Sequence, residues 1–411
     1  MSFELGLVEV SELRLGARTA LHDGVLSVDA DGLSRRLLDS DRRLAGARVH
    51  VVRPKERTRL VCVKDVIEPR CKVRGEQRGE GRRHALAGMA VVTCGQIVGF
   101  QEGLIDMSGP GAGYAPFSAL QLLVLELDPV EGLAPHEHEA ALREAGIRAA
   151  DVLGQLAADA EPSRVERCAL EPCSDALPRV AYVYMLLSQG LLHDTWVEGR
   201  NARDGLPRLV PPAFALDDGI VSGNCVSACD KNTTWHHQNN PILRELFRRH
   251  GRDLNFAGVV LTNEPVRLGE KRASAQAAIE LTRSLEAAGA IISKEGFGNP
   301  DADQMMLIRG LESAGVRTVA ITDEYAGVDG ASQSLADTAR EADAIVSVGN
   351  ANELLELPAM DRVIGPANVV EKLAGVNRDS MLATGGLRVE LQALVGATNQ
   401  LGQGRLRCVD A

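Results

Sequence analysis

The sequence predicts an α/β protein, with a mixed α/β N-terminal half that contains many strands and a C-terminal half built as an open parallel sheet flanked by helices. In the C-terminal half, apolar runs at residues 256–261, 290–292, 318–321 and 344–348 alternate with helical segments at 271–288, 301–314 and 332–342. This alternation is typical of parallel strands joined by crossover helices. In the N-terminal half, short apolar runs follow one another with one long helical pattern among them, which favours mixed sheets.

The N-terminal strands are indicated by alternation and by turn residues. Residues 8–10 alternate, and Asp23-Gly24, a hairpin dipeptide, separates two apolar runs within 19–28. Further strands are predicted at 47–52, 60–63, 89–93, 122–127 and 179–187, and a long helix at 138–158.

Breaker residues organise the middle of the chain. Pro207, Pro211 and Pro212 exclude a helix before residue 224, so this approach is expected to be extended and exposed. Pro241 begins a predicted helix at 241–250. The chain is therefore divided into two predicted regions, 1–224 and 225–411, of which the second begins with Cys225.

Composition limits the classes of function. The 411 residues are 45% hydrophobic and carry a formal net charge of −11, which argues against nucleic acid and anionic membrane as partners. The chain has no apolar run long enough to span a membrane and no signal-like start, so a cytoplasmic location is expected. Its eight cysteines form no C-x-x-C pair, and outside the central stretch they are expected to be buried, reduced thiols.

The central stretch, residues 219–241 (GIVSGNCVSACDKNTTWHHQNNP), is dense in reactive side chains. The thiol of Cys225 can attack the carbonyl of Asn224, and Gly223 leaves the backbone free to adopt the geometry required. Elimination from the resulting thioester and hydrolysis of the imine would leave a pyruvoyl group at position 225. Its ketone can form Schiff bases with amines, as an external cofactor does elsewhere. Alternatively, Asn224 can cyclise to a succinimide and release an unaltered Cys225.

Other side chains of this stretch are candidates for supporting roles. Asp230, Lys231, Thr233 and His236 could polarise the Asn224 carbonyl, or later hold the substrate and move protons. Cys229 is either a second reactive thiol or a packed one. Because adjacent histidines point to opposite sides of an extended chain, His236 and its neighbour do not indicate a metal site.

Three predicted strands are followed by a glutamate that stands three positions after the last residue of the apolar run. Glu264, Glu295 and Glu324 should therefore share the carboxyl edge of the sheet, where such folds bind ligands. A row of acids suits an amine substrate, but strand ends are also polar because they emerge into solvent. His193 and Asp194 follow the strand at 179–187 and are either further substrate contacts or parts of a hydrogen-bonded turn.

Several motifs besides the central stretch carry a resemblance to a known family. They are residues 63–69 (VKDVIEP), 99–103 (GFQEG), 106–111 (DMSGPG), 189–195 (QGLLHDT) and 332–337 (SQSLAD). With these motifs the chain resembles, over essentially its whole length, the alpha and beta subunit proprotein of component B of the glycine, sarcosine and betaine reductases.

The resemblance implies cleavage between Asn224 and Cys225 and a pyruvoyl cofactor made from Cys225. It further implies a subunit of an oligomeric oxidoreductase that binds a small amino acid or amine and cleaves its C–N bond with a larger, selenol- or thiol-bearing partner subunit. The chain contains no selenocysteine, so the partner has to supply the selenol. The family does not fix the amine.

Two alternatives remain open from the residues alone. The chain could be a pyruvoyl enzyme of another reaction type, such as a decarboxylase, or an unprocessed binding or scaffold protein. The intact mass distinguishes the second alternative from the others.

Overall fold

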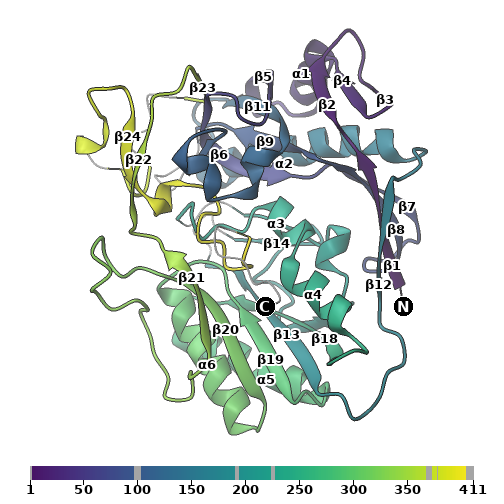
Figure 1. Ribbon diagram of the computed structural model, residues 1–411, viewed down its shortest axis with the longest axis vertical. Coiled ribbons are helices and arrows are strands. Elements are labelled where there is room, and N and C mark those ends of the chain that lie inside the picture. Colours follow the sequence, from purple (N-terminus) through teal and green to yellow (C-terminus); the bar gives the residue numbers. More distant parts are fainter. Residues whose placement is uncertain are drawn as a thin grey trace.

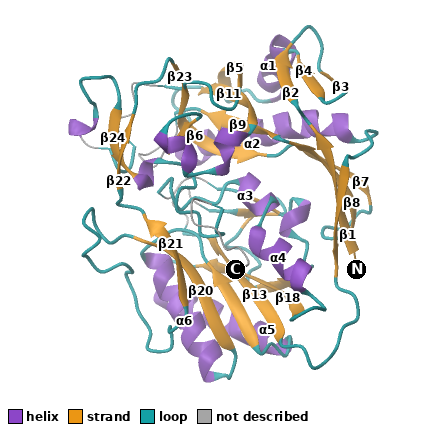
Figure 2. Cartoon of the chain, viewed as in Figure 1, coloured by secondary structure: helices purple, strands orange, loops and turns teal. Residues whose placement is uncertain are grey.

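The computed structural model describes residues 2–96, 103–189, 194–223, 227–366, 373–376 and 378–403. Two large sheets dominate this part of the chain, and Figure 1 shows one in the upper and one in the lower half of the view. The helices α3 (Thr234–Gln238) and α4 (Pro241–Arg249) lie between them. Figure 2 shows the same mixture of strands and helices, and the predicted α/β class is confirmed.

The upper sheet is mixed and has the strand order β10-β6-β9-β11-β5, with β23 paired to β6. Its strands are β5 (Leu44–Val52), β6 (Thr58–Ile67), β9 (Met89–Cys94), β10 (Gly103–Asp106), β11 (Gln121–Pro129) and β23 (Arg362–Ile364). The long helix α2 (Pro135–Gly154) packs on it through Leu142, Ala145 and Ala149. Every residue of β6 is buried, so this strand forms the centre of the upper core.

Two further sheets complete the N-terminal part. One has the order β12-β1-β8-β7 and the other the order β2-β4-β3. Their elements, with the adjoining helix, are β1 (Ser2–Glu9), β2 (Glu12–Leu15), β3 (Ala20–His22), β4 (Val25–Val28), α1 (Ala30–Ser40), β7 (Arg70–Arg74), β8 (Gly81–Ala87) and β12 (Arg164–Ala169). The hairpin predicted at Asp23-Gly24 is confirmed: β3 and β4 pair antiparallel, and both turn residues have positive φ, 48° and 75°.

The lower sheet has the order β16-β18-β13-β19-β20-β21, and all its pairs are parallel except the one with β16. Its elements are β13 (Arg179–Leu187), β16 (Arg208–Val210), β18 (Asn255–Glu264), β19 (Gly289–Ser293), β20 (Arg317–Glu324) and β21 (Ile345–Asn350). The helices α5 (Leu268–Ser284) and α6 (Asn299–Ser313) cover one face. The predicted parallel sheet is therefore confirmed, with β13 added at its centre.

The position of β13 creates a switch point in the sheet. The chain runs from β13 to β18 on one side and then returns to β19 on the other side of β13. Open α/β sheets bind ligands where the strand order reverses in this way, outside the carboxyl ends of the strands. In this sheet that place lies beyond Leu187 of β13 and Ser293 of β19.

Both large sheets contain strands from before and after residue 224. The strand β13 precedes this position but lies between β18 and β19, and β23 follows it but pairs with β6. The division into 1–224 and 225–411 remains a prediction about the products of cleavage, and the sheets themselves cross it.

The predicted helix at 332–342 is wrong, because this segment forms bends and turns between β20 and β21. Its backbone amides donate to acceptors outside the segment itself: Ser332 to the Ala326 carbonyl, and Ala336 to the carboxylate of Asp301 in α6 at 2.8 Å. Leu335 and Ala339 still pack on the core beneath. The apolar positions thus reflect burial of an irregular segment, since serine and aspartate favour such local bonds over a helix.

The remaining described elements are short. They are β14 (Trp196–Val197), β15 (Arg200–Asn201), β17 (Ile220–Val221), β22 (Leu354–Leu357), β24 (Leu387–Glu390) and the 3-10 turns η1 (Pro110–Gly113), η2 (Pro116–Ala119), η3 (Gln155–Ala157), η4 (Ala215–Asp217), η6 (Arg378–Ser380) and η7 (Leu391–Ala393). No helix within the described ranges is long and apolar enough to cross a membrane.

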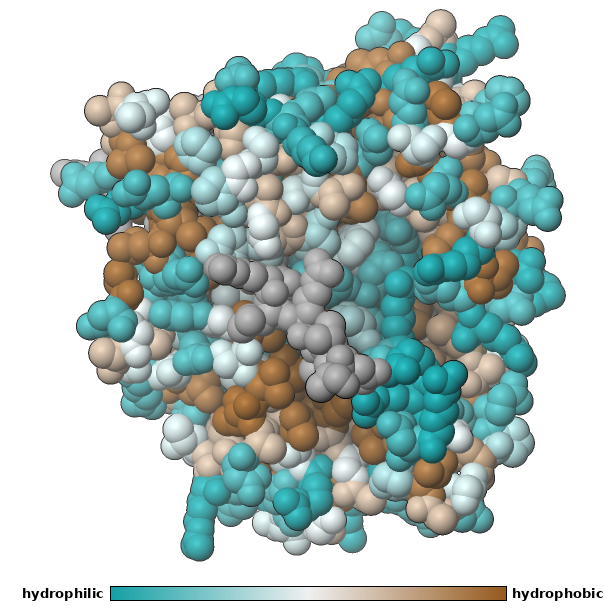
Figure 3. Space-filling model, in the orientation of Figure 1, coloured by the Kyte–Doolittle hydropathy of each residue, from teal (hydrophilic) through white to brown (hydrophobic). Residues whose placement is uncertain are grey.

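The second face of the lower sheet is covered unevenly. The helix α4 packs over β18, whereas Val319 and Val346 near the other edge are each 39% exposed. Figure 3 shows hydrophobic atoms gathered over this part of the sheet. This face therefore carries an open apolar area beside the region where α3 and α4 lie.

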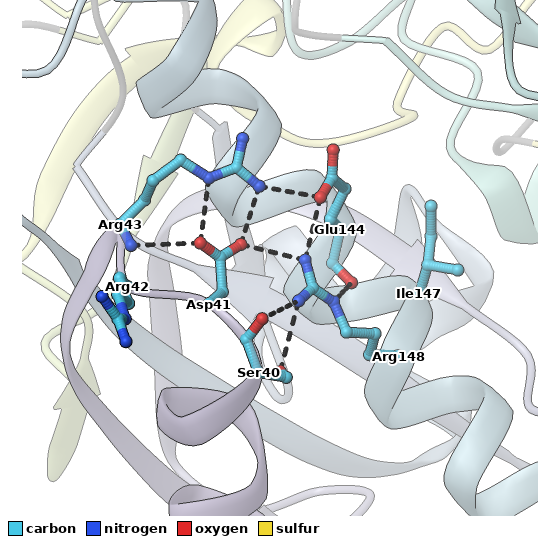
Figure 4. A pocket seen from close by; sticks show the side chains of 7 residues that line it. All are labelled: Ser40, Asp41, Arg42, Arg43, Glu144, Ile147 and Arg148. Atoms are coloured by element: carbon cyan, nitrogen blue, oxygen red, sulfur yellow. Dashed lines mark hydrogen bonds and ion pairs between the residues drawn. The ribbon is translucent and has the colours of Figure 1, made fainter.

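An ion-pair network joins the end of α1 to α2 at the surface (Figure 4). Asp41 accepts hydrogen bonds from the guanidinium of Arg43 at 2.7 and 2.9 Å and from that of Arg148 at 2.9 Å, and Glu144 bonds to both arginines. The hydrogen bond from Arg43 is the main reason why the pKa of Asp41 falls to about 2. Four of the groups that line the adjoining cavity of about 420 Å³, Asp41, Arg43, Glu144 and Arg148, therefore already neutralise one another.

Candidate active site

The described parts of the central stretch, residues 219–223 and 227–241, lie between the two large sheets. Thr233 caps α3: its hydroxyl accepts the backbone N–H of His236 at 3.2 Å, and its own N–H donates to His236 Nδ1 at 3.1 Å. The Nε2 atom of the same imidazole is buried and has no hydrogen-bond partner among the described residues. Burial lowers the pKa of His236 well below its ordinary value, with help from the charges of His237 and Lys231. His236 is therefore a neutral ring whose Nε2 atom faces the interior. Asn224 and Cys225, the predicted scissile pair, lie outside the described residues.

Two lysines converge on the carbonyl that precedes the predicted scissile pair. The ammonium of Lys64 donates to Gly223 O at 2.7 Å and that of Lys231 at 2.9 Å. Lys64 comes from β6, at a bulge between Val63 and Asp65 that shifts the pairing with β9. A bulge redirects a side chain. Both lysines are buried, so their charges act on Gly223 O with little screening by water.

A second set of contacts fixes the backbone just before this point. The carboxylate of Asp65 accepts the N–H and the hydroxyl of Thr234 at 2.9 and 2.6 Å, and the Thr234 hydroxyl accepts the N–H of Ser222 at 3.0 Å. Ser222 and Gly223 are consequently buried, so the expectation of an exposed approach is wrong. The residues needed to hold this segment come from β6 and α3, which cover it.

The stretch also reaches the switch point of the lower sheet. His237 Nε2 lies 3.2 Å from Glu295 Oε1, and Tyr184 of β13 hydrogen bonds to His237 Nδ1. The second oxygen of Glu295 accepts the N–H of Leu187 at 2.8 Å and the hydroxyl of Thr195 at 2.6 Å. Burial raises the pKa of Glu295, but the hydrogen bond and charge of His237 outweigh it, and the net shift is downward. Glu295 is thus an ionised carboxylate at the carboxyl ends of β13 and β19.

The structure brings two of the three predicted glutamates together. The Glu295 backbone N–H donates to Glu264 Oε1 at 3.1 Å, while Glu264 Oε2 is buried and bonds to no other residue that the structure describes. Burial, with the charges of Asp303 and Glu295, raises the pKa of Glu264 well above its ordinary value. Glu324 instead accepts a hydrogen bond from Ser347 of the edge strand β21 and is partly exposed.

Asp230 lies in a second buried group, beside Asp323. Neither carboxyl oxygen of Asp230 hydrogen bonds to another described residue, and burial and the charge of Asp323 raise its pKa well above the ordinary value. Asp323 accepts hydrogen bonds from Gln400 at 2.6 Å and Thr398 at 3.0 Å, and burial raises its pKa to about 6. Lys294, which pairs with Asp301, supplies the nearby positive charge. Asp230 is therefore a neutral acid enclosed in the protein.

Cys229 is packed. Its side chain is fully buried, with its sulfur 3.7 Å from the Tyr325 hydroxyl, and burial raises its pKa well above the ordinary value. A thiol of this kind is a poor nucleophile. Cys62, Cys71, Cys94 and Cys168 are also buried, as predicted, whereas Cys173 is partly exposed.

Of the two predicted contacts in the loop after β13, the structure describes only Asp194. His193 lies outside the described residues. Asp194 is buried and accepts a hydrogen bond from Asn201 at 2.6 Å, and it lies 3.3 Å from the guanidinium of Arg203. Arg203, Ser188 and Asn263 line a cavity of about 650 Å³ at the carboxyl ends of β13 and β18. Asp194 therefore orients one wall of this cavity.

Sequence reasoning missed several residues of the site. Lys64, Lys294 and Asp323 are buried charged groups within or beside predicted strands. A charged residue within an otherwise apolar run was the available signal, because such a group is buried only when it is paired or functional. Tyr184 carried no comparable signal, since aromatic residues are common in buried strands.

The model of the family of glycine/sarcosine/betaine reductase component B subunits matches residues 1–408. The chain is 44% identical over 422 residues to the glycine reductase complex component B subunits alpha and beta of Acetoanaerobium sticklandii, covering 98% of each chain. It is 43% identical to the sarcosine reductase complex component B subunit alpha of Peptoclostridium acidaminophilum, over 99% of each chain. Identity to the betaine reductase complex component B subunit alpha of the same organism is 38%, over 89% of this chain and 88% of the relative. No solved structure matches the chain.

Proposed function

The chain belongs to the family of component B subunits of the glycine, sarcosine and betaine reductases, and from that premise we propose that it is the substrate-binding subunit of a reductase that cleaves the C–N bond of a small amino acid or amine. It acts in the cytoplasm, in an oligomeric assembly with a larger subunit that carries a selenol or thiol. Its cofactor is a pyruvoyl group made by self-cleavage between Asn224 and Cys225.

The proposed cleavage uses only atoms of the chain and water. The Cys225 thiol adds to the Asn224 carbonyl and expels the amide nitrogen, which forms a thioester. Loss of the Cys225 α-proton then breaks the Cβ–S bond and releases the thiocarboxylate of Asn224. The remaining dehydroalanine becomes an imine, and water replaces its nitrogen as ammonia to leave the pyruvoyl group. Hydrolysis of the thiocarboxylate gives a carboxylate and H2S.

The observation that carries this proposal is the pair of buried ammonium groups at Gly223 O, one residue before the proposed bond. Attack on the Asn224 carbonyl creates an oxyanion, and fixed cations in a site without water stabilise such a charge strongly. Asp65, Thr234 and Ser222 hold the backbone in place during the attack. Because Ser222 and Gly223 just before the bond are buried, we expect water to have little access to the thioester before elimination.

A pyruvoyl group supplies a ketone that condenses with amines and withdraws electrons from their α-carbon. The surrounding side chains suit that chemistry. Asp230 is a buried neutral acid whose oxygens bond to no other described residue, and it can donate a proton to a leaving amine. The carboxylate of Glu295 can attract an ammonium group to the switch point. The Nε2 atom of His236, which has no partner within the described part of the chain, faces the same interior.

Intact mass spectrometry of the purified protein tests the cleavage. Two chains of roughly 24 and 20 kDa are expected, and the smaller should be about 33 Da lighter than its encoded mass because H2S is lost and the imine becomes a ketone. Cys225→Ala should block the cut. An unaltered N-terminal cysteine would favour the succinimide route, and a single full-length chain from active protein would refute the proposal.

The need for a partner subunit can be tested separately. Cys229 is packed, and no other described thiol lies at the site. The isolated protein should therefore trap an amine covalently with borohydride but release no ammonia from it reductively. Sustained reductive deamination by this chain with only a dithiol added would contradict the need for a partner.

A further inference from the structure

The buried segment 396–401 packs along the central stretch. The backbone N–H of Thr398 donates to the carbonyl of the residue before Asp230 at 2.9 Å, and the side-chain amide of Asn399 donates to the carbonyl of the residue after it at 3.2 Å. Asp323, at the end of β20, accepts hydrogen bonds from the same segment. The segment therefore joins the two buried acids of the site.

The side-chain donors of this segment bond to Asp323 and not to Asp230. Gln400 Nε2 donates to Asp323 Oδ1 at 2.6 Å, and the Thr398 hydroxyl donates to Asp323 Oδ2 at 3.0 Å. Neither carboxyl oxygen of Asp230 bonds to another described residue. Hydrogen bonds stabilise the charged form of a carboxyl, whereas burial without donors stabilises its neutral form. The arrangement therefore favours a negative charge on Asp323 and a proton on Asp230.

The charges around the two acids agree with this division. Burial raises the pKa of Asp323 to about 6, against the lowering effects of the Lys294 charge and of the two hydrogen bonds. Burial raises the pKa of Asp230 well above its ordinary value, and the charge of Asp323 raises it further. The other titratable groups that act on the pair are Asp301, which pairs with Lys294, and Glu295, Cys229 and Tyr325. Since like charges disfavour each other, the pair keeps one proton at neutral pH.

We propose that Thr398 and Gln400 hold a negative charge on Asp323, and that this charge in turn keeps on Asp230 the proton that the leaving amine receives. Asp323, Thr398 and Gln400 are then positioning residues, which act through Asp230. The inference rests on the proposed function, in which Asp230 is the acid. When the C–N bond breaks, its electron pair leaves with the nitrogen, which takes the proton of Asp230. The selenol or thiol of the partner subunit bonds to the carbon in its place.

Two variants remove the donors one at a time. Gln400→Leu removes the amide, and Thr398→Val replaces the hydroxyl by a methyl group, so that one can be measured if the other fails to fold. Thr398→Ser keeps the hydroxyl and should behave as the wild type. Gln304→Leu is the matched control, because Gln304 is equally buried but donates to the carbonyl of Ile321 at 3.1 Å and not to a carboxylate.

Carbon NMR of the aspartate carboxyls, assigned with Asp230→Asn and Asp323→Asn, locates the proton without requiring catalysis. In the wild type, Asp323 should lose its proton at lower pH than Asp230. Gln400→Leu and Thr398→Val should each raise the Asp323 midpoint by about one pH unit, as expected for loss of one hydrogen bond to a charged group. The Thr398→Ser and Gln304→Leu variants should leave it unchanged. Prior ionisation of Asp230 in the wild type, or an Asp323 midpoint that neither donor variant moves, would overturn the proposal.

Turnover with the partner subunit, expressed per cut chain from intact mass, tests the link to the reaction. Asp323→Asn removes the charge that raises the pKa of Asp230, so the Asp230 midpoint and the fall of the rate at high pH should both move to lower pH by about one unit. A rate profile that stays in place while the Asp230 midpoint moves would refute the positioning role. An uncut wild-type chain would refute the proposed function, whereas the carboxyl titrations would still decide which acid carries the proton.

Discussion

The imidazole of His237 lies 3.2 Å from the carboxylate of Glu295, and this contact ties the stretch after residue 226 to the carboxyl edge of the parallel sheet. The two residues come from different parts of the fold, α3 and the end of β19. Their contact joins the chemistry predicted for the central stretch to the ligand-binding edge predicted from the strand pattern.

The two neighbouring glutamates should respond differently to the same substitution. Glu264 has a raised pKa and is a neutral acid, so Glu264→Gln replaces one neutral group by another and should change the free energy of unfolding by less than about 1 kcal/mol. Glu295 is ionised and accepts two hydrogen bonds on one oxygen, so Glu295→Gln should cost about 2 kcal/mol. Urea denaturation at neutral pH measures both. Equal losses would contradict the assigned protonation states.

Trapping of the amine gives a separate prediction for the same edge. Glu295→Gln should reduce borohydride trapping of glycine about tenfold, because it removes the carboxylate at the switch point. Glu324→Gln is the matched control: Glu324 bonds to Ser347 at the sheet edge, so trapping should stay within about twofold of the wild type. A larger effect at Glu324 than at Glu295 would count against the switch point as the amine site.

The Asp230→Asn substitution should slow turnover without lowering the stability of the protein. The carboxyl is buried and neutral, and an amide of the same shape should leave the unfolding midpoint nearly unchanged. Loss of a proton donor should slow turnover with the partner subunit about 100-fold. In the wild type, the rate should fall as pH rises through the raised pKa of Asp230, and the variant should lose this dependence. A variant with the wild-type rate and pH profile would exclude Asp230 as the acid.

Two glycines with the same backbone angle test the position of His236. Gly396 has φ +75°, and a Cβ there would lie 2.6 Å from His236 Cε1, whereas Gly402 has φ +76° and open space around it. Both alanine variants should lose about 1 kcal/mol through backbone strain. Only Gly396→Ala should also slow the cleavage, which the cut fraction over time would reveal. Equal cleavage in the two variants would mean that the exact position of His236 is unimportant for it.

The network at Asp41 predicts a pH dependence of stability. The pKa of Asp41 is about 2 in the folded protein, against an ordinary value of 3.8 for an aspartate without this network. The carboxylate therefore stabilises the fold by about 2 kcal/mol above pH 5, and this contribution is lost as pH falls through the folded pKa. The difference in unfolding free energy between wild type and Asp41→Asn should therefore shrink from about 2 kcal/mol at pH 6 toward zero near pH 2. A difference that is constant with pH would show that the ion pairs do not contribute through charge.

The parts of the fold that sequence predicted well are those determined locally. The apolar runs at β18, β19 and β20 and the turn at Asp23-Gly24 depend on periodicity and backbone preference within a few residues. The central place of β13 was not predictable, because its pairing with β18 and β19 joins distant parts of the chain. Residues 332–342 have helical spacing, yet their serine and aspartate residues favour local bonds over a helix.

The candidate site shows a similar limit. Lys64 faces Gly223 through a bulge in β6, and no local rule predicts where a bulge falls. At the end of β20, Asp323 rather than Glu324 joins the buried acids, because successive residues of a strand point to opposite sides. A repeated sequence pattern at three strand ends therefore does not place equivalent side chains in one crevice.

Because β13 lies at the centre of the lower sheet, the two products of the proposed cut belong to a single folding unit. The fragment ending at residue 224 carries β13, which has both its sheet neighbours, β18 and β19, in the other fragment. Each piece alone would expose unpaired strand edges, which promote aggregation. The chain must therefore fold before it is cut, and the cut pieces should stay together through dilution and part only in denaturant. Two genes encoding the pieces separately would leave no Asn224–Cys225 bond to cut, so the pieces would not form the pyruvoyl group even when made in the same cell.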